Sequence, residues 1–252
     1  MRLFLHELRT EQLLFWRNRE AAFFTFFLPV IFFLIFASVY GDTRIKKEGG
    51  IRGASFLEAG MIGYGVASTA FAGLAITMVI RRETGVLKRV RATPLPPTTY
   101  LVAVLVSTFV TFLIQSLLII GIGRVLFHVG FPSRPLSLLL ALVVGAACFA
   151  ALGLGLTGFV RSAEGASAVV NFIYLPMAII SGTFFSPQHY PAFLKAIANV
   201  LPLTYFTKLS RDVMVNGHHL WAEKSALAVV GAWGVAGLIV AVRRFRWQPR
   251  EA

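Results

Sequence analysis

Six apolar stretches, each long enough to cross a lipid bilayer, alternate with short polar segments along this chain. A helix rises 1.5 Å per residue, so about 20 apolar residues cross a hydrocarbon core of roughly 30 Å. The pattern predicts an all-α integral membrane protein, with a single transmembrane domain over residues 1–252. The six predicted spans are residues 21–41, 59–80, 98–123, 136–160, 166–185 and 225–242.

Two further segments predict helices that do not cross the membrane. Residues 2–20 form an amphipathic pattern, typical of a helix lying at the membrane interface, although a solvated helix is the alternative. Five apolar side chains fall within an arc of about 120°: Phe4, Leu5, Leu8, Phe15 and Trp16. Gln12 interrupts this arc and Leu3, Leu13 and Leu14 lie outside it, so the amphipathic pattern is imperfect. Residues 186–224 combine proline breaks with few charges, which predicts short helices that dip into the outer leaflet.

Small side chains recur every four residues within two of the spans. Such spacing places them on one helix face, where close backbone approach holds helices together in lipid. The two predicted packing stripes are Gly65, Thr69, Gly73 and Thr77 in the second span, and Ala147, Ala151 and Gly155 in the fourth.

The composition agrees with a membrane protein, since 57% of the residues are hydrophobic and only 14% are charged. The net charge of +13 could indicate nucleic-acid binding, but the basic residues lie between the apolar runs, where they flank spans. We therefore expect contact with membrane lipids and none with nucleic acid. The side that holds both termini carries 14 of the 24 Lys and Arg residues, which places the termini and residues 81–97 in the cytoplasm.

The chemistry that the chain lacks narrows its function. No span has a charged residue or histidine at its centre, as ion-coupled carriers usually need, and the sequence has neither an HExxH motif nor a phosphate-binding GxxxxGK[ST] loop. We expect no catalytic residue and no metal site, so any energy for transport must come from a separate polypeptide. The neutral polar residues within or near the spans are the candidates for a substrate pathway: Thr111, Gln115, Asn171, Tyr174, Ser181 and Thr183.

Residues 81–97 hold five basic residues and three prolines between two spans. On a helix that starts near Arg82, one arc of about 100° holds the side chains of Glu83, Val86, Leu87 and Val90. The apolar members could anchor to the membrane domain or fill a cleft in a partner, while the cations face acidic groups or lipid phosphates. The alternative is a positively charged loop that only fixes the topology.

Two motifs carry a resemblance to a known family. Residues 82–95 (RETGVLKRVRATPL) resemble the cytoplasmic loop motif of ABC type-2 transporter permeases, in which an E-x-G-T-L-like segment precedes basic residues and an A-T-P step. Val86 stands where that family often has threonine. Residues 181–187 (SGTFFSP), followed by residues 201–205 (LPLTY) and Arg211, are similar to the same family's outer segment between the last two spans.

The resemblance implies the permease half of a bacterial exporter of drug-like or lipid-like compounds in the plasma membrane. Such a permease dimerises, here as a homodimer, and two ATPase subunits that carry ATP and Mg²⁺ dock on it, so no cofactor is expected in this chain. The implied ATPase contact is a coupling element made of Glu83, Thr84, Gly85, Val86, Leu87, Lys88, Arg89 and Arg91. The outer segment either closes the exit of a pathway or only supplies interfacial aromatic residues. Two other functions remain open at this point: a gradient-driven carrier that acts without an ATPase, and a scaffold with no transport.

Overall fold

The computed structural model describes residues 2–46 and 49–248, and these are almost entirely helical. Six helices are long and apolar enough to span a membrane. They are α2 (Arg19–Tyr40), the continuous helix Gly53–Glu83, α6 (Pro97–Phe127), α7 (Pro135–Thr157), α8 (Ala163–Ile180) and α11 (Lys224–Arg244). The shorter elements are α1 (Arg2–Arg17), α5 (Val86–Arg91), α9 (Ala192–Ala198), α10 (Pro202–Met214), the 3₁₀ turns η3 (Pro187–His189) and η4 (Leu220–Ala222), and a hairpin of β1 (Arg44–Ile45) and β2 (Ile51–Arg52).

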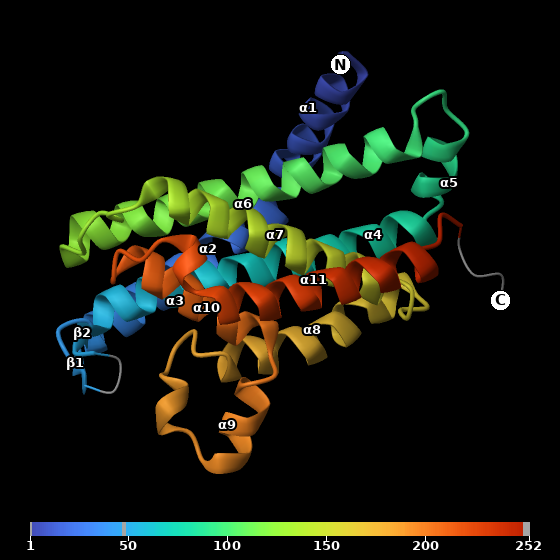
Figure 1. Cartoon of the computed structure of the whole chain (residues 1–252). Helices are drawn as coiled ribbons and strands as arrows, with labels where there is room; N and C mark the ends of the chain where they lie inside the picture. The colour runs from blue at the N-terminus through green and yellow to red at the C-terminus, as the bar shows by residue number, and fades with distance from the viewer. Residues whose placement is uncertain (1, 47–48, 249–252) are drawn as a thin grey trace.

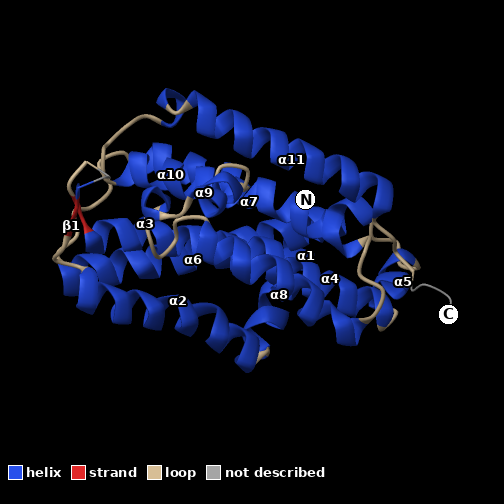
Figure 2. Cartoon of the chain, turned by 90° about the horizontal axis from the view of Figure 1, so that it is seen from below, coloured by secondary structure: helices blue, strands red, loops and turns tan. Residues whose placement is uncertain are grey.

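The long helices lie side by side in one bundle (Figure 1). The hairpin β1–β2 lies at one end, and α5 lies at the opposite end together with the last residues of α11, as both views show (Figures 1 and 2). We call the end that holds α5 the coupling end and the end that holds the hairpin the hairpin end. Helix α1 leaves the bundle at a steep angle beside α6, and α9 lies outside the bundle, below it in Figure 1.

The second spanning helix starts earlier than predicted. It begins at Gly53, so Glu58, which we had expected in a loop, lies inside α3 (Gly53–Val66) with a side chain that is 1% exposed. Its carboxyl group faces Gly123 of α6, where a Cβ atom would stand 3.0 Å from the Glu58 Cδ. Because Glu58 is near the start of this 31-residue helix, the prediction that no span holds a charge at its centre still applies.

The middle of this helix is not α-helical. The π-helix η2 (Ala67–Gly73) interrupts it before α4 (Leu74–Glu83) continues to the coupling end. A π-helix changes the angular step per residue, so Gly65, Thr69, Gly73 and Thr77 do not form one continuous packing face. Gly65 meets Gln115 and Phe112 of α6, whereas Gly73 and Thr77 are exposed within this chain.

The predicted packing face of the fourth span is confirmed over most of its length. A Cβ on Gly155 would lie 3.1 Å from the Gly237 carbonyl oxygen of α11, and one on Gly237 would lie 3.0 Å from the Ala151 carbonyl carbon. These small residues let α7 and α11 approach closely. Ala147 is the exception, because its side chain is exposed.

The fifth span ends earlier than predicted, at Ile180. Gly182 then takes a left-handed φ of +79°, which a residue with a side chain rarely adopts, and the chain turns. The turn is buried and is fixed to α10, since the Thr207 hydroxyl donates to the Ser181 carbonyl oxygen at 2.9 Å. Residues 186–224 then form the short helices that the sequence predicts, with α10 packed against α3, α7 and α11.

Candidate functional site

The coupling element begins with the last residue of α4 and contains the short helix α5. We predicted one helix starting near Arg82, and this is wrong: α4 ends at Glu83, and α5 starts only at Val86. Gly85 separates the two helices with a φ of +74°, and the Thr84 hydroxyl donates to the Ile80 carbonyl oxygen. Glu83 and Val86 therefore belong to different helices and do not share one face.

Helix α5 has one buried side and one free cationic side. The Leu87 side chain is fully buried in the main core cluster, and Val90 packs against the same cluster from a half-buried position. Lys88, Arg89 and Arg91 are exposed. Of the two roles expected for the apolar residues, Leu87 takes the first, because it anchors α5 to the membrane domain.

Arg82 connects this element to the bundle through a side chain that is only 1% exposed. Its Nη1 donates to the Thr157 carbonyl oxygen at 2.8 Å and its Nη2 donates to the Val160 carbonyl oxygen at 2.7 Å. Its Nε donates to Glu83 Oε1 at 2.6 Å. A cation at the carbonyl end of α7 is favourable because the last carbonyl groups of a helix carry partial negative charge.

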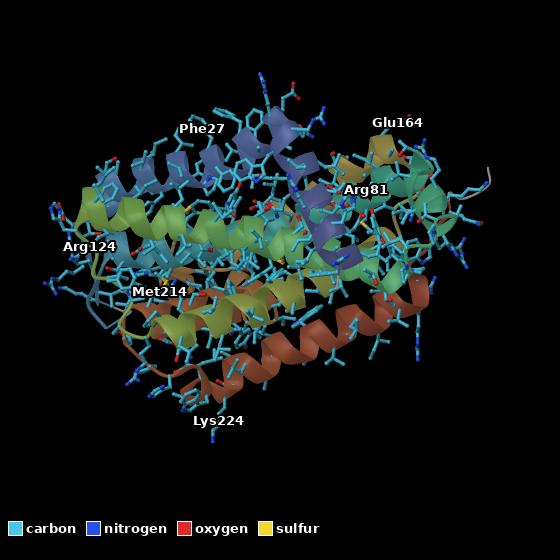
Figure 3. All side chains as sticks on the ribbon, turned by 90° about the horizontal axis from the view of Figure 1, so that it is seen from above. Phe27, Arg81, Arg124, Glu164, Met214 and Lys224 are labelled. Atoms are coloured by element: carbon cyan, nitrogen blue, oxygen red, sulfur yellow. The ribbon has the colours of Figure 1, made fainter. Side chains whose placement is uncertain are left out.

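The neighbouring Arg81 points to a different partner. Its guanidinium makes a bidentate ion pair with Glu11 of α1, at 2.7 and 2.8 Å, and also donates to the Tyr100 hydroxyl of α6 at 2.8 Å. Helix α1 is tied to α6 a second time, because Gln12 Nε2 donates to the Ser107 carbonyl oxygen and hydroxyl. Figure 3 shows Arg81 beside α1, in the half of the bundle away from Arg124.

Consecutive arginines thus connect the last turn of α4 to three other helices. Arg81 connects it to α1 and α6, and Arg82 connects it to α7 and to the start of the coupling element. Charges withdrawn from water need such partners. The sequence contained one signal for this arrangement: Gln12 interrupts the apolar arc of α1, and Glu11 precedes it.

The predicted pathway residues lie in three separate places. Thr111 and Gln115 face the first two helices from α6, and Gln115 Nε2 donates to the Thr25 carbonyl oxygen of α2 at 2.9 Å. Asn171 and Tyr174 lie on α8, where Asn171 is half-buried and the Tyr174 ring is 5.7 Å from the Tyr64 ring.

The remaining two, Ser181 and Thr183, are fully buried in the turn after α8. The Thr183 carbonyl group contacts Gly60 of α3. Phe184 follows and packs its ring against Phe32 at 5.8 Å and against Tyr64 at 6.2 Å. The turn therefore meets the aromatic cluster of α2 and α3, and Tyr64 joins that cluster to Tyr174.

Sequence reasoning missed the buried Arg211 environment on α10. Its guanidinium lies 3.7 Å from the centre of the Phe56 ring, and its Nη2 donates to the Gly182 carbonyl oxygen at 3.1 Å. Within residues 2–46 and 49–248, no group of three His, Cys, Asp or Glu side chains is placed to hold a metal ion.

Comparison with known proteins agrees with this architecture. The profile of the family described as "ABC-2 type transporter" matches residues 2–215, which include α1, the coupling element and α10. The chain is similar to the protein named "Putative transport permease YvfS" of Bacillus subtilis (strain 168), with 25% identity over 206 residues, or 81% of this chain and 82% of that protein. The chain therefore belongs to the ABC-2 type transporter family, as the permease of an ABC transporter.

Proposed function

We propose that this chain is the membrane-spanning subunit of an exporter that moves a hydrophobic or amphipathic compound, drug-like or lipid-like, out of the cytoplasm. ABC-2 permeases work with a separate ABC ATPase, and we assign two ATPase copies to a homodimer of this chain. The observation that carries the proposal is α5, which is anchored by Leu87 and presents Lys88, Arg89 and Arg91 outward.

The geometry supports transmission of force from this surface. A partner that pulls on α5 acts directly on α4, because the two helices are joined by only Thr84 and Gly85. The hydrogen bonds of Arg82 connect α4 to α7, and those of Arg81 connect α4 to α1 and α6. The docked ATPase would therefore move a connected set of helices and not a loose loop, as rocking between inward and outward states requires.

An apolar pathway suits the proposed substrate. A groove of about 630 Å³ between α6, α7 and α11 is lined almost wholly by apolar side chains, Phe109 and Ala147 among them. Helix α8 leaves Phe172 82% exposed next to the half-buried Asn171, which favours this face for the second protomer. The pathway residues Thr111, Gln115, Asn171, Tyr174, Ser181 and Thr183 remain our candidates for contact with substrate.

The proposal places the coupling end, with both termini, in the cytoplasm of a bacterial cell whose plasma membrane holds the chain. The concentration of exposed cations at this end supports that orientation. Cysteine scanning with a membrane-impermeant maleimide on intact cells tests it. We expect a cysteine at Arg89 to stay unlabelled until the cells are opened, and one at Asp42 to react at once.

Co-purification with the ATPase tests the docking surface. We expect Arg89→Glu to abolish or greatly weaken the complex, because it reverses a charge on the exposed side of α5. Arg243→Glu is the matched control, since it makes the same change at the end of α11, on an exposed side chain of the same end of the bundle. Equal loss in both variants, or in neither, would remove α5 from the interface.

Transport direction needs its own measurement. Inverted membrane vesicles that contain the permease and the ATPase should accumulate a fluorescent amphiphile when ATP is added, and the accumulation should survive an ionophore that collapses ion gradients. Accumulation that the ionophore abolishes would favour a gradient-driven carrier instead.

A further inference from the structure

A cavity with apolar and polar walls lies beneath α1 and shares Thr108 with the groove described above. It has a volume of about 200 Å³, is partly open, and is lined by α1, the start of α2, η2, α4 and α6. Its polar side chains are those of Glu11, Asn18, Thr69, Thr77, Arg81, Ser107, Thr108 and Thr111. The cavity lies towards the coupling end, because Glu11 on its wall pairs with Arg81 in the last turn of α4.

Three of the hydroxyl groups around this cavity are arranged as acceptors. Thr69, Thr108 and Thr111 each donate to the carbonyl oxygen four residues earlier in their own helices, at 2.7, 2.9 and 3.2 Å. A hydroxyl that has given its only proton to the backbone retains oxygen lone pairs and can only accept a further bond. The Ser107 hydroxyl already accepts from Gln12.

The carboxylate on the wall adds to the acceptors. Each Glu11 oxygen accepts one N–H from Arg81, and an ionised carboxylate has about four lone-pair sites, so each oxygen can accept another bond. The ion pair as a whole is neutral, which leaves hydrogen bonding rather than net charge to select a ligand. Glu11 and the three threonines therefore offer acceptors to a molecule that donates hydrogen bonds, while Asn18 and Arg81 supply the wall with donors.

The backbone beside the cavity provides an independent observation. Thr69 and Gly73 line the cavity from η2, a seven-residue π-helix inside a membrane-spanning helix. π-helical segments are rare, and where they interrupt α-helices they often mark functional sites. Here the segment turns Thr69 and Gly73 towards the space under α1.

We propose that this cavity binds a hydrogen-bond-donating headgroup, a primary ammonium or a set of hydroxyls, on an amphiphile whose apolar tail stays in the surrounding membrane. The volume admits such a headgroup. Apolar Leu14 and Phe15 also line the cavity, and Leu14 is 51% exposed, so a tail has an apolar surface beside the opening. The assignment rests on the proposed export of amphipathic compounds, and it specifies the headgroup.

Protection of a single cysteine tests the site in the full-length permease. Cys148 is the only cysteine of the chain, so Thr77→Cys in a Cys148→Ala background places one thiol on the cavity wall. The purified protein is put into nanodiscs of dioleoyl phosphatidylethanolamine or dioleoyl phosphatidylcholine, and its rate of maleimide labelling is measured. These lipids share their chains, but only the first has N–H donors.

Dodecylamine and dodecyltrimethylammonium in detergent form a second matched pair. We expect the donor of each pair to protect the thiol, with labelling slowed about tenfold at a ligand concentration ten times the dissociation constant, because only the empty site reacts. Protection by the lipid alone would identify a membrane lipid as the occupant, and protection by the amine alone would identify a free amphiphile. Equal labelling rates within both pairs would overturn the proposal.

A hydroxyl deletion separates recognition from simple blockage. Thr69→Val in the same background removes an acceptor and keeps the shape, so protection by the donor probes should fall. Thr43→Val is the control, because its hydroxyl also donates to a backbone carbonyl, that of Tyr40, but stands at the hairpin end. Unchanged protection in Thr69→Val would count against the site. The assay needs neither ATP nor the ATPase, so failure of ATPase docking at α5 would leave its result unchanged.

Discussion

Replacement of Arg82 by methionine removes three hydrogen bonds at once from the junction between α4, α7 and the coupling element. The carbonyl oxygens of Thr157 and Val160 lose their donors in a region where the Arg82 side chain is 1% exposed. Glu83 loses its cation but reaches water more easily, since its side chain is 17% exposed.

The expected cost follows from these partners. A hydrogen bond to a charged group contributes about 1.5–3 kcal/mol, and the buried acceptors that remain cost a further amount, but such contributions do not add. Methionine recovers part of the loss because it fills much of the same space. We therefore expect Arg82→Met to lower the free energy of unfolding by about 3 kcal/mol, near the lower limit for breaking a buried charged contact.

Two measurements separate stability from coupling. Thermal unfolding of the detergent-solubilised permease should show a lower melting temperature for Arg82→Met than for the parent protein. Arg82→Lys should melt between the parent and Arg82→Met, because lysine keeps the charge but not the guanidinium fork. In the reconstituted complex, the number of ATP molecules hydrolysed per substrate exported should rise for both variants, because α5 no longer moves α7 with it.

Arg89→Gln is the matched control, on the exposed side of the same element. It should leave the melting temperature unchanged and weaken ATPase binding, whereas Arg82→Lys should retain binding. If Arg82→Met melts at the parent temperature and keeps the parent ratio of ATP to substrate, Arg82 does not connect the coupling element to α7.

Three further changes test other parts of the structure. Glu11→Gln should destabilise the protein by about 3–5 kcal/mol, because it leaves the Arg81 cation without its anion. Adding Arg81→Met should recover much of the loss in melting temperature. Strict additivity of the two changes would show that the pair is not coupled. Gly123→Ala should lower the free energy of unfolding by about 1–3 kcal/mol, because its Cβ clashes with the Glu58 carboxyl group. Glu58→Gln should retain ATP-driven export in vesicles. Loss of export in Glu58→Gln with intact ATPase binding would indicate ion coupling. Burial, and then the charge of Glu11, raise the pKa of Glu7 above its ordinary value of 4.5. The ionised carboxylate therefore disfavours the folded state at pH values above the raised pKa, and this cost decreases as the pH falls through that pKa and is absent below 4.5. Melting temperatures should rise as the pH is lowered from neutral towards 4.5, and should rise less in Glu7→Gln; an equal gain in both proteins would assign the effect to other groups.

The sequence was sufficient for the six spans because hydrophobic length is a local property that the bilayer itself imposes. It was insufficient at the span ends, where tertiary contacts decide. From the sequence alone Glu58 is expected in a loop, because nothing there indicates that Gly123, which has no side chain, leaves space for the Glu58 carboxyl group. The predicted fifth span runs to Phe185, yet Gly182 turns the chain there and the Thr207 hydroxyl of α10 bonds the Ser181 carbonyl oxygen.

The coupling element shows the same limit at the site. Its buried and exposed residues could be sorted by type, and the sequence placed Leu87 apart from Lys88, Arg89 and Arg91, as the structure does. The break at Gly85 was not predicted, because T-G-V fits both a continuous helix and a turn. The π-helix η2 has no sequence signal of its own, so the cavity under α1 could not be predicted either.

Arg81 and Arg82 show why a charge at a span end is ambiguous. Successive residues on a helix point about 100° apart, so neighbouring arginines at the end of a helix inside a bundle start towards different neighbours. In this protein one turns to Glu11 and the other to the carbonyl end of α7, and their neighbours on α5 are the cations that stay exposed. The rule that places basic residues on the cytoplasmic side holds equally for both groups, since it concerns only the depth of a charge. What distinguishes them is whether an acceptor stands opposite in the folded bundle, and on that division rests our proposal that Arg81 and Arg82 transmit motion within the permease while Lys88, Arg89 and Arg91 contact the ATPase.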